Sequence, residues 1–239
     1  MQPINMKILI ILATVLFSLT LNAQEINGTY FEGPDSLSFN DNHVIFSIRG
    51  NDALGVIFVG EGIYEIIDDF MIIKTETYSG KKTKVDTRAA TKKDTVKLQL
   101  FNQDGYSIQG VRAEFLNRKN KSIDLKISDD SGIILYRHNP KVASIKVSDL
   151  LYDKATFEYE ANTDYTIHLV KNRVLEDKIV VLKLIDRTDS KLTVKLLSTD
   201  FKRTNPSSSH LNRLEKKTKA IIDRTRSFEI PTTEFNFYN

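Results

Sequence analysis

Apolar and polar residues alternate with a period of two along much of residues 96–136, and turn-type residues interrupt this alternation twice. The alternate apolar positions fall in three rows, Leu98 and Leu100, then Val111, Ala113 and Phe115, then Ile123, Leu125 and Ile127. The interruptions are Asp104-Gly105 and Asp129-Asp130-Ser131-Gly132. Because successive side chains of a strand point to opposite faces, the pattern predicts short antiparallel strands, each with one apolar face, joined by tight turns.

The alternation continues through residues 142–147, 155–159 and 165–170. About seven short strands therefore fall within roughly 80 residues, which is typical of a Greek-key β-sandwich. We expect this central domain to occupy residues 94–172.

Two hairpins are predicted before the central domain, in residues 24–80. Residues 36–39 and 44–48 flank one turn-rich tetrapeptide, and residues 62–67 and 70–74 flank Asp68-Asp69. Domains of ~60 residues without disulfides are marginally stable, so this small antiparallel β-module should need a partner.

A third hairpin is predicted over residues 179–197, and its place is open between two arrangements. In the first, residues 174–200 complete the N-terminal module, so that the central domain is an insertion. In the second, the hairpin extends the edge of the sandwich. Charge favours the first, because residues 24–80 carry ten acidic and two basic side chains while residues 187–239 carry six acidic and eleven basic ones.

Residues 81–93 carry six basic side chains and one acidic side chain and show no apolar periodicity. The composition predicts a solvated basic linker. No aromatic residue is interleaved for base stacking, which disfavours binding of nucleic acid.

One amphipathic helix is predicted in the C-terminal part, residues 173–239. Leu211, Leu214, Ile221 and Ile222 recur at helical spacing among basic residues. A packed apolar stripe under a solvated basic face is favoured over contact with an acidic partner or a membrane surface. The aromatic tail at residues 235–238 is either an added edge strand or a frayed end.

The first 23 residues have the pattern of a signal peptide. Lys7 precedes the apolar run Ile8–Leu21, and Ala23 offers a small residue for cleavage. The run is shorter than the ~20 residues of a membrane-spanning helix. We therefore expect an exported protein, periplasmic or extracellular, and the absence of cysteine from the sequence excludes disulfides and thiolate chemistry.

Residues 94–172 resemble the carboxypeptidase-regulatory-like domain, a transthyretin-like β-sandwich. The resemblance is carried by Asp104-Gly105, Ile108-Gln109-Gly110-Val111, Asp129-Asp130-Ser131-Gly132-Ile133, Ile145-Lys146-Val147-Ser148 and Tyr165-Thr166-Ile167-His168-Leu169. Such domains are accessory modules, so the resemblance implies a scaffold or interaction role and transfers no zinc ligands.

The sequence carries no recognisable catalytic, cofactor-binding or metal site. None of its four histidines is followed at the third or fourth position by a histidine or carboxylate that would make a helical zinc pair, and no nucleophile elbow, P-loop or dinucleotide fingerprint occurs. Asp68-Asp69 and Asp129-Asp130 are read as turn residues rather than Ca²⁺ ligands. Four tyrosines are candidates for carbohydrate binding: Tyr30, Tyr64, Tyr106 and Tyr152.

The sequence thus predicts a mostly β, secreted, non-catalytic accessory, binding or scaffold protein. Its central domain would bind a protein or glycan of the cell envelope, without a cofactor. The alternative is a secreted hydrolase with carboxylates such as Asp52, Glu61 and Glu65 gathered on the N-terminal sheet.

Overall fold

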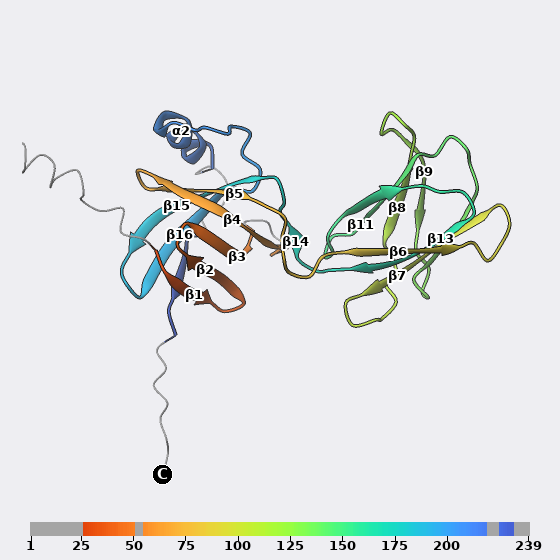
Figure 1. Ribbon diagram of the computed structural model, residues 1–239, viewed down its shortest axis with the longest axis horizontal. Helices are drawn as coiled ribbons and strands as arrows, with labels where there is room; N and C mark the ends of the chain where they lie inside the picture. Colours follow the sequence, from red (N-terminus) through yellow and green to blue (C-terminus); the bar gives the residue numbers. More distant parts are fainter. Residues whose placement is uncertain (1–25, 51–54, 219–224, 232–239) are drawn as a thin grey trace, which may run out of the picture.

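The computed structural model describes residues 26–50, 55–218 and 225–231, and it is mostly β, as predicted. Figure 1 shows the strands in two bodies, one built from both ends of the described chain and one from its middle. The expected signal peptide, Asp52, the second half of the predicted helix and the aromatic tail lie outside the described residues.

The first body is an eight-strand barrel. Around it the strand order is β4-β3-β2-β1-β17-β16-β15-β5, and β5 pairs back to β4 to close the circle. The strands are β1 (Gly28–Glu32), β2 (Asp35–Asn40), β3 (His43–Arg49), β4 (Ile57–Ile67), β5 (Phe70–Thr75), β15 (Ile179–Arg187), β16 (Lys191–Ser198) and β17 (Thr225–Glu229).

Alternate residues of these strands fill the barrel. The buried cluster draws on strands from both ends of the chain, with Leu37, Phe46, Ile73, Leu182 and Phe228 among its members. A barrel of eight strands has an interior just wide enough to be filled by side chains, so this body needs no disulfide to hold a core.

The two N-terminal hairpins and the hairpin over 179–197 are present as predicted. Strand β15 pairs with β5 on one side and β16 on the other, which is the pairing that the insertion arrangement requires. In the second of these hairpins, strand β4 approaches β5 closely at Gly62. A Cβ there would collide with the backbone of Lys74 and Thr75.

Strand β17 is an element that the sequence analysis did not predict. It lies between β1 and β16, so the barrel is closed through it. Its sequence is polar apart from Phe228, which is fully buried in the barrel core. The expected small N-terminal module is therefore part of a larger barrel whose last strand comes from the C-terminal region.

The second body consists of two four-stranded sheets, ordered β10-β7-β13-β6 and β12-β11-β8-β9. Their strands are β6 (Lys84–Ala89), β7 (Thr95–Asn102), β8 (Arg112–Leu116), β9 (Ser122–Ile127), β10 (Ile133–Arg137), β11 (Ser144–Ser148), β12 (Ala155–Glu158) and β13 (Thr163–Leu169). Both sheets contribute to one buried cluster, with Leu98, Phe115 and Ile167 at its centre. We call this body the central module.

The expectation of a solvated linker over residues 81–93 is wrong. Residues 84–89 form β6, which pairs with β13, and Val85 packs against the core of the central module. The buried Asp164 carboxylate fixes the end of this strand, because it accepts hydrogen bonds from the backbone N–H and hydroxyl of Thr91 and from the N–H of Lys97. An edge strand tolerates many charges, so its charged composition concealed it.

The chain crosses between the two bodies twice, and the crossings are bonded to each other. The N–H and hydroxyl of Thr75 donate to the carbonyl of Lys178, and the Glu176 carboxylate accepts from the N–H of Tyr78 at 2.7 Å and from Lys82 at 2.9 Å. The short strand β14 (Arg173–Val174) pairs with β4. These hydrogen bonds join the two crossing segments that connect the central module to the barrel.

Helix α2 (Ser208–Thr218) packs on the outside of the barrel (Figure 1). Leu211 is fully buried against Phe70, Ile72 and neighbouring apolar residues of β15 and β16. The Lys183 ammonium lies 2.9 Å from the Glu215 carboxylate of the helix and joins it to the barrel. The described part of the predicted apolar stripe is therefore packed, and the basic side chains of the helix lie on its exposed face.

Candidate binding groove at the edge of the central module

One aspartate of each acidic pair singled out in the sequence makes a structural contact. The Asp129 carboxylate accepts hydrogen bonds from the N–H groups of Ser131 and Ile133, as a turn residue does. Asp69 forms an ion pair of 2.6 Å with Lys183. Among the described residues, no three His, Asp or Glu side chains are grouped as a metal site would require.

The two carboxylates of the hydrolase alternative that lie within the described residues also have partners. Glu61 accepts a hydrogen bond of 2.6 Å from the Ser79 hydroxyl, and Glu65 forms an ion pair of 3.1 Å with Lys74.

Of the four candidate tyrosines, only one presents most of its surface to solvent. Tyr30 is buried in the barrel, and Tyr64 and Tyr152 pack against the two cores. Tyr106, in the turn after β7, is 71% exposed.

Strand β9 exposes its apolar side chains. Ile123, Leu125 and Ile127 are 37%, 40% and 61% exposed. Leu125 lies opposite Glu114 of β8, whereas the buried Phe115 lies opposite Asp124. Leu125 and Ile127 thus lie on the outer face of the sheet, whereas Asp124 and Lys126 lie on the side of the core.

The other edge of β9 is open, since no strand of the described chain follows it in the sheet. Just after β9, the Ser128 N–H donates to the Val111 carbonyl, and the Ser128 carbonyl accepts from the Gly110 N–H, just before β8. Because hydrogen-bonding direction alternates along an antiparallel ladder, the N–H and C=O groups of Leu125 and Ile127 point to the open edge. The Leu125 N–H is bonded only locally, to the Asp124 carboxylate at 2.7 Å.

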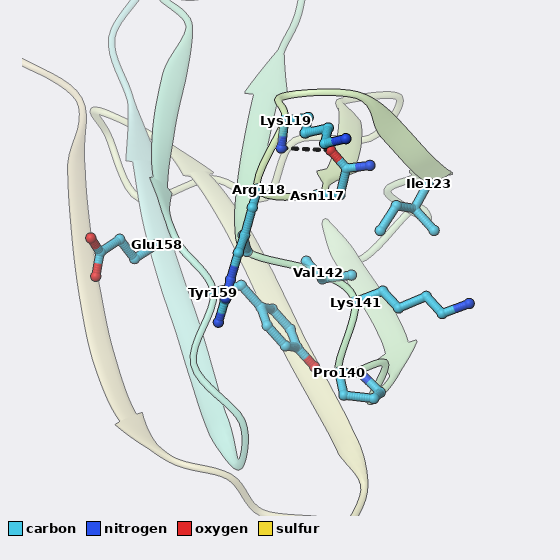
Figure 2. Close-up of a pocket in the computed structure, with 10 residues that line it drawn as sticks. Asn117, Arg118, Lys119, Ile123, Pro140, Lys141, Val142, Glu158 and Tyr159 are labelled. Carbon is cyan, nitrogen blue, oxygen red and sulfur yellow. Dashed lines mark hydrogen bonds between the residues drawn. The ribbon is translucent and has the colours of Figure 1, made fainter.

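A groove of about 830 Å³ begins beside this strand (Figure 2). It is lined by Asn117, Arg118, Lys119, Ile123, Pro140, Lys141, Val142, Ala143, Glu158 and Tyr159. Figure 2 shows Tyr159 reaching toward Pro140 and the Glu158 carboxylate directed away from both. A second groove, of about 720 Å³, shares Pro140 and includes Asp124 and Lys126 of β9 and Arg137 of β10.

Two turns hold the walls of the first groove in place. The Asn117 side-chain carbonyl accepts hydrogen bonds from the N–H groups of Lys119 at 2.8 Å and Lys121 at 3.1 Å. On the opposite wall, the Asn139 side chain accepts from the N–H of Lys141 at 3.0 Å. The basic side chains around the groove are therefore carried on turns whose backbone is fixed by local hydrogen bonds.

Tyr159 supplies a neutral polar group to the groove. Burial raises the pKa of its phenol, outweighing a hydrogen bond to the backbone of Asn139, so the phenol keeps its proton at neutral pH. Its oxygen lies 2.8 Å from Nδ1 of His138, and the two rings are stacked 8° from parallel.

The charge around the two grooves is strongly positive. Five cations at this end of the module form no ion pair within the described chain: Arg118, Lys119, Lys121, Arg137 and Lys141. Lys126 is paired with Asp124 at 3.5 Å. The site combines an exposed apolar row, an open strand edge and uncompensated positive charge.

The sequence reasoning missed this site, although a signal for it was present. The run Asn117-Arg118-Lys119-Asn120-Lys121 is a basic turn immediately before an alternating strand. The sequence does not reveal that β9 lies at the edge of its sheet with exposed apolar side chains.

The sequence matches no protein-family model, no curated protein and no solved structure.

Within the described part of the chain, no helix combines the length and apolar character needed to cross a membrane.

Proposed function

We propose that this chain is an exported, non-catalytic binding protein of the cell envelope whose central module holds a partner protein at the β9 edge. The observation that carries the proposal is the exposed row Ile123, Leu125 and Ile127 beside uncompensated cations. Soluble proteins seldom expose contiguous apolar rows next to a groove unless something covers them.

We also propose that the central module is a transthyretin-like sandwich of the carboxypeptidase-regulatory kind. Two four-stranded sheets that contribute to one buried cluster support this. So do the glycines at the turns that carry the resemblance. Gly132 has a φ of +70°, and a Cβ there would lie 2.6 Å from the Leu100 carbonyl oxygen.

A scaffold role for the barrel fits this proposal. The barrel core is filled by its own side chains, and two bonded crossings attach the central module to it. The hydrolase alternative has less support, because Glu61 and Glu65 are engaged with Ser79 and Lys74.

The test is recovery of a partner from envelope extract with purified full chain. The Leu125→Ser/Ile127→Ser variant removes two of the three side chains of the exposed apolar row without touching either core. A matched control is Ile45→Ser/Ile63→Ser, which removes two side chains of similar exposure from the barrel surface, 43% and 45%.

We expect a protein, identified by mass spectrometry and then purified, to bind the wild-type chain and the barrel variant equally. Its affinity for the β9 variant should fall at least about tenfold, the loss expected when side chains at the centre of an interface are truncated. Equal affinity for all three chains would refute the proposal.

Glycan binding is the second candidate, and one observation favours it. A pocket of about 220 Å³ beside the exposed Tyr106 turn is lined by Asn102, Gln103, Asp104, Tyr152, Lys171 and Asn172. Amide, carboxylate and aromatic groups are those that bind sugars. A glycan array probed with the wild-type chain and with Gln103→Ala/Asn172→Ala tests this candidate.

A further inference from the structure

We infer that the partner supplies an extended segment of alternating acidic and apolar residues, which pairs with β9 and adds a fifth strand to its sheet. This inference rests on the proposed function, and it specifies the chemistry of the partner at the same site.

The backbone of β9 is the first argument. Leu125 and Ile127 direct their N–H and C=O groups to the open edge of the sheet. Such an edge is a template for another strand, and proteins usually protect it by covering it or by placing charged side chains on the edge strand. Here three of the six residues of β9 are apolar and exposed, so the edge is poorly protected.

The two faces of β9 then define the side chains of the added strand. One set of alternate residues would lie beside Leu125 and Ile127 on the outer face, where apolar side chains extend the exposed row. The other set would lie beside Lys126, in the groove that also contains Arg137 of β10. Acidic side chains complement these cations, and the basic turn before β9 adds Lys121 at one end.

Asp124 acts as a removable cover of this edge. Its carboxylate occupies the Leu125 N–H at 2.7 Å and offsets the charge of Lys126 at 3.5 Å. An incoming backbone carbonyl would replace the carboxylate at Leu125, and an incoming acidic side chain would replace it at Lys126. Removing Asp124 should therefore strengthen binding.

The experiment uses a capped peptide of about eight alternating Glu and Val residues, a length that matches a typical strand. Its affinity for the purified full chain is measured by titration calorimetry. Three comparison probes are the same peptide N-methylated at every second amide, a Lys-Val peptide, and a linear oligosaccharide of uronic acids.

We expect the Glu-Val peptide to bind and the Lys-Val peptide not to bind. N-methylation removes donors that the β9 carbonyls need, so it should weaken binding at least about tenfold. The Asp124→Ala variant should bind the Glu-Val peptide several-fold more tightly, and Asp130→Ala, an exposed turn residue beyond β9, should leave affinity unchanged.

Two results would overturn strand addition. Equal affinity for the N-methylated peptide or for the oligosaccharide would mean that charge alone is recognised. No binding of the Glu-Val peptide, together with loss of partner recovery in the Leu125→Ser/Ile127→Ser chain, would refute the inference and leave the proposed function standing. If the Leu125→Ser/Ile127→Ser chain recovers the partner as well as the wild-type chain does, the proposed function itself is refuted, because the partner then does not bind at β9.

Discussion

A buried charge cluster on the barrel makes the sharpest prediction about stability. Asp35, the first residue of β2, is fully buried. Nη1 of Arg226, on β17, lies 2.8 Å from Oδ2 of Asp35 and 3.6 Å from the Glu32 carboxylate. The N–H of Arg49 also donates to the Asp35 carboxylate, at 3.2 Å. The cluster therefore joins the C-terminal strand to the N-terminal hairpin.

Arg226→Met keeps most of the side-chain volume and removes the charge. Loss of one partner of a buried ion pair typically costs 3–5 kcal/mol, because the other charge is left uncompensated. Arg49 remains beside Asp35, with an Nη2 to Oδ1 distance of 3.7 Å, so the lower end applies. We expect a loss of about 3 kcal/mol, or roughly a hundredfold rise in the opening equilibrium of β17.

The assay is native-state hydrogen exchange followed by mass spectrometry, which assigns the loss to individual strands. Exchange should accelerate in β1, β2 and β17. It should remain unchanged in the central module, whose buried cluster is separate. The matched control is Glu229→Gln on the same strand, which breaks the exposed Lys191–Glu229 pair of 3.8 Å and should cost less than about 1 kcal/mol.

The reasoning is refuted if Arg226→Met and Glu229→Gln accelerate exchange equally. It is also refuted if Arg226→Met accelerates exchange in the central module as much as in the barrel. The first outcome would mean that the buried cluster does not hold β17 in place, and the second that the two bodies do not open separately.

Three further predictions concern other parts of the fold. Burial alone would raise the pKa of the Asp164 carboxyl, but its hydrogen bonds and the nearby Arg88 lower that pKa. The ionised carboxylate therefore stabilises the fold above its unfolded-state pKa, and this stabilisation is lost as pH falls through the lowered folded-state pKa. Thermal melts between about pH 7 and 3 should show this loss in the wild-type chain and a weaker pH dependence in Asp164→Asn. Val85→Asp should destabilise the central module by more than about 1.5 kcal/mol in urea unfolding, with the exposed Thr87→Asp as control, whereas a linker would tolerate both changes equally. Leu211→Ala should release helix α2 from the barrel at a cost of about 2–5 kcal/mol, measured as faster hydrogen exchange in α2, and unchanged exchange would contradict the packing described.

The hairpins could be predicted because the information for them is local. Asp41 and Asp68 both adopt positive φ, of 52° and 54°, in tight turns between alternating segments. Turn residues and strand alternation lie within a few positions of each other in such cases, so a short stretch of sequence contains both.

Strands whose partners lie far away in the sequence were harder to predict. β6 contains one core residue, Val85, and pairs with β13 more than 70 positions later. β17 contains one, Phe228, and pairs with β1 near the other end of the chain. Because each strand has a single core residue, the alternation of apolar and polar residues does not identify it in the sequence. Its strand conformation depends on pairing with strands that lie far away in the sequence.

The distribution of charge in the sequence predicted one of these long-range contacts in part. The acidic segment 24–80 and the basic segment after residue 186 meet in the barrel through Arg226 with Asp35 and Glu32. Opposite net charge indicated that the segments attract each other. It could not indicate which arginine is buried, because that depends on where β17 enters the sheet.

The outward face of β9 has a single geometric cause that alternation cannot reveal. Leu116 pairs with Ser122, and continuing that register would place Ile123 opposite Phe115 and Leu125 opposite Ala113, on the core face. Instead a bulge between Phe115 and Leu116 places Asp124 opposite Phe115, and a shift of one residue exchanges the two faces of the strand. Without the bulge, Ile123 and Leu125 would have faced the core. The candidate binding surface therefore exists because one extra residue sits in one strand.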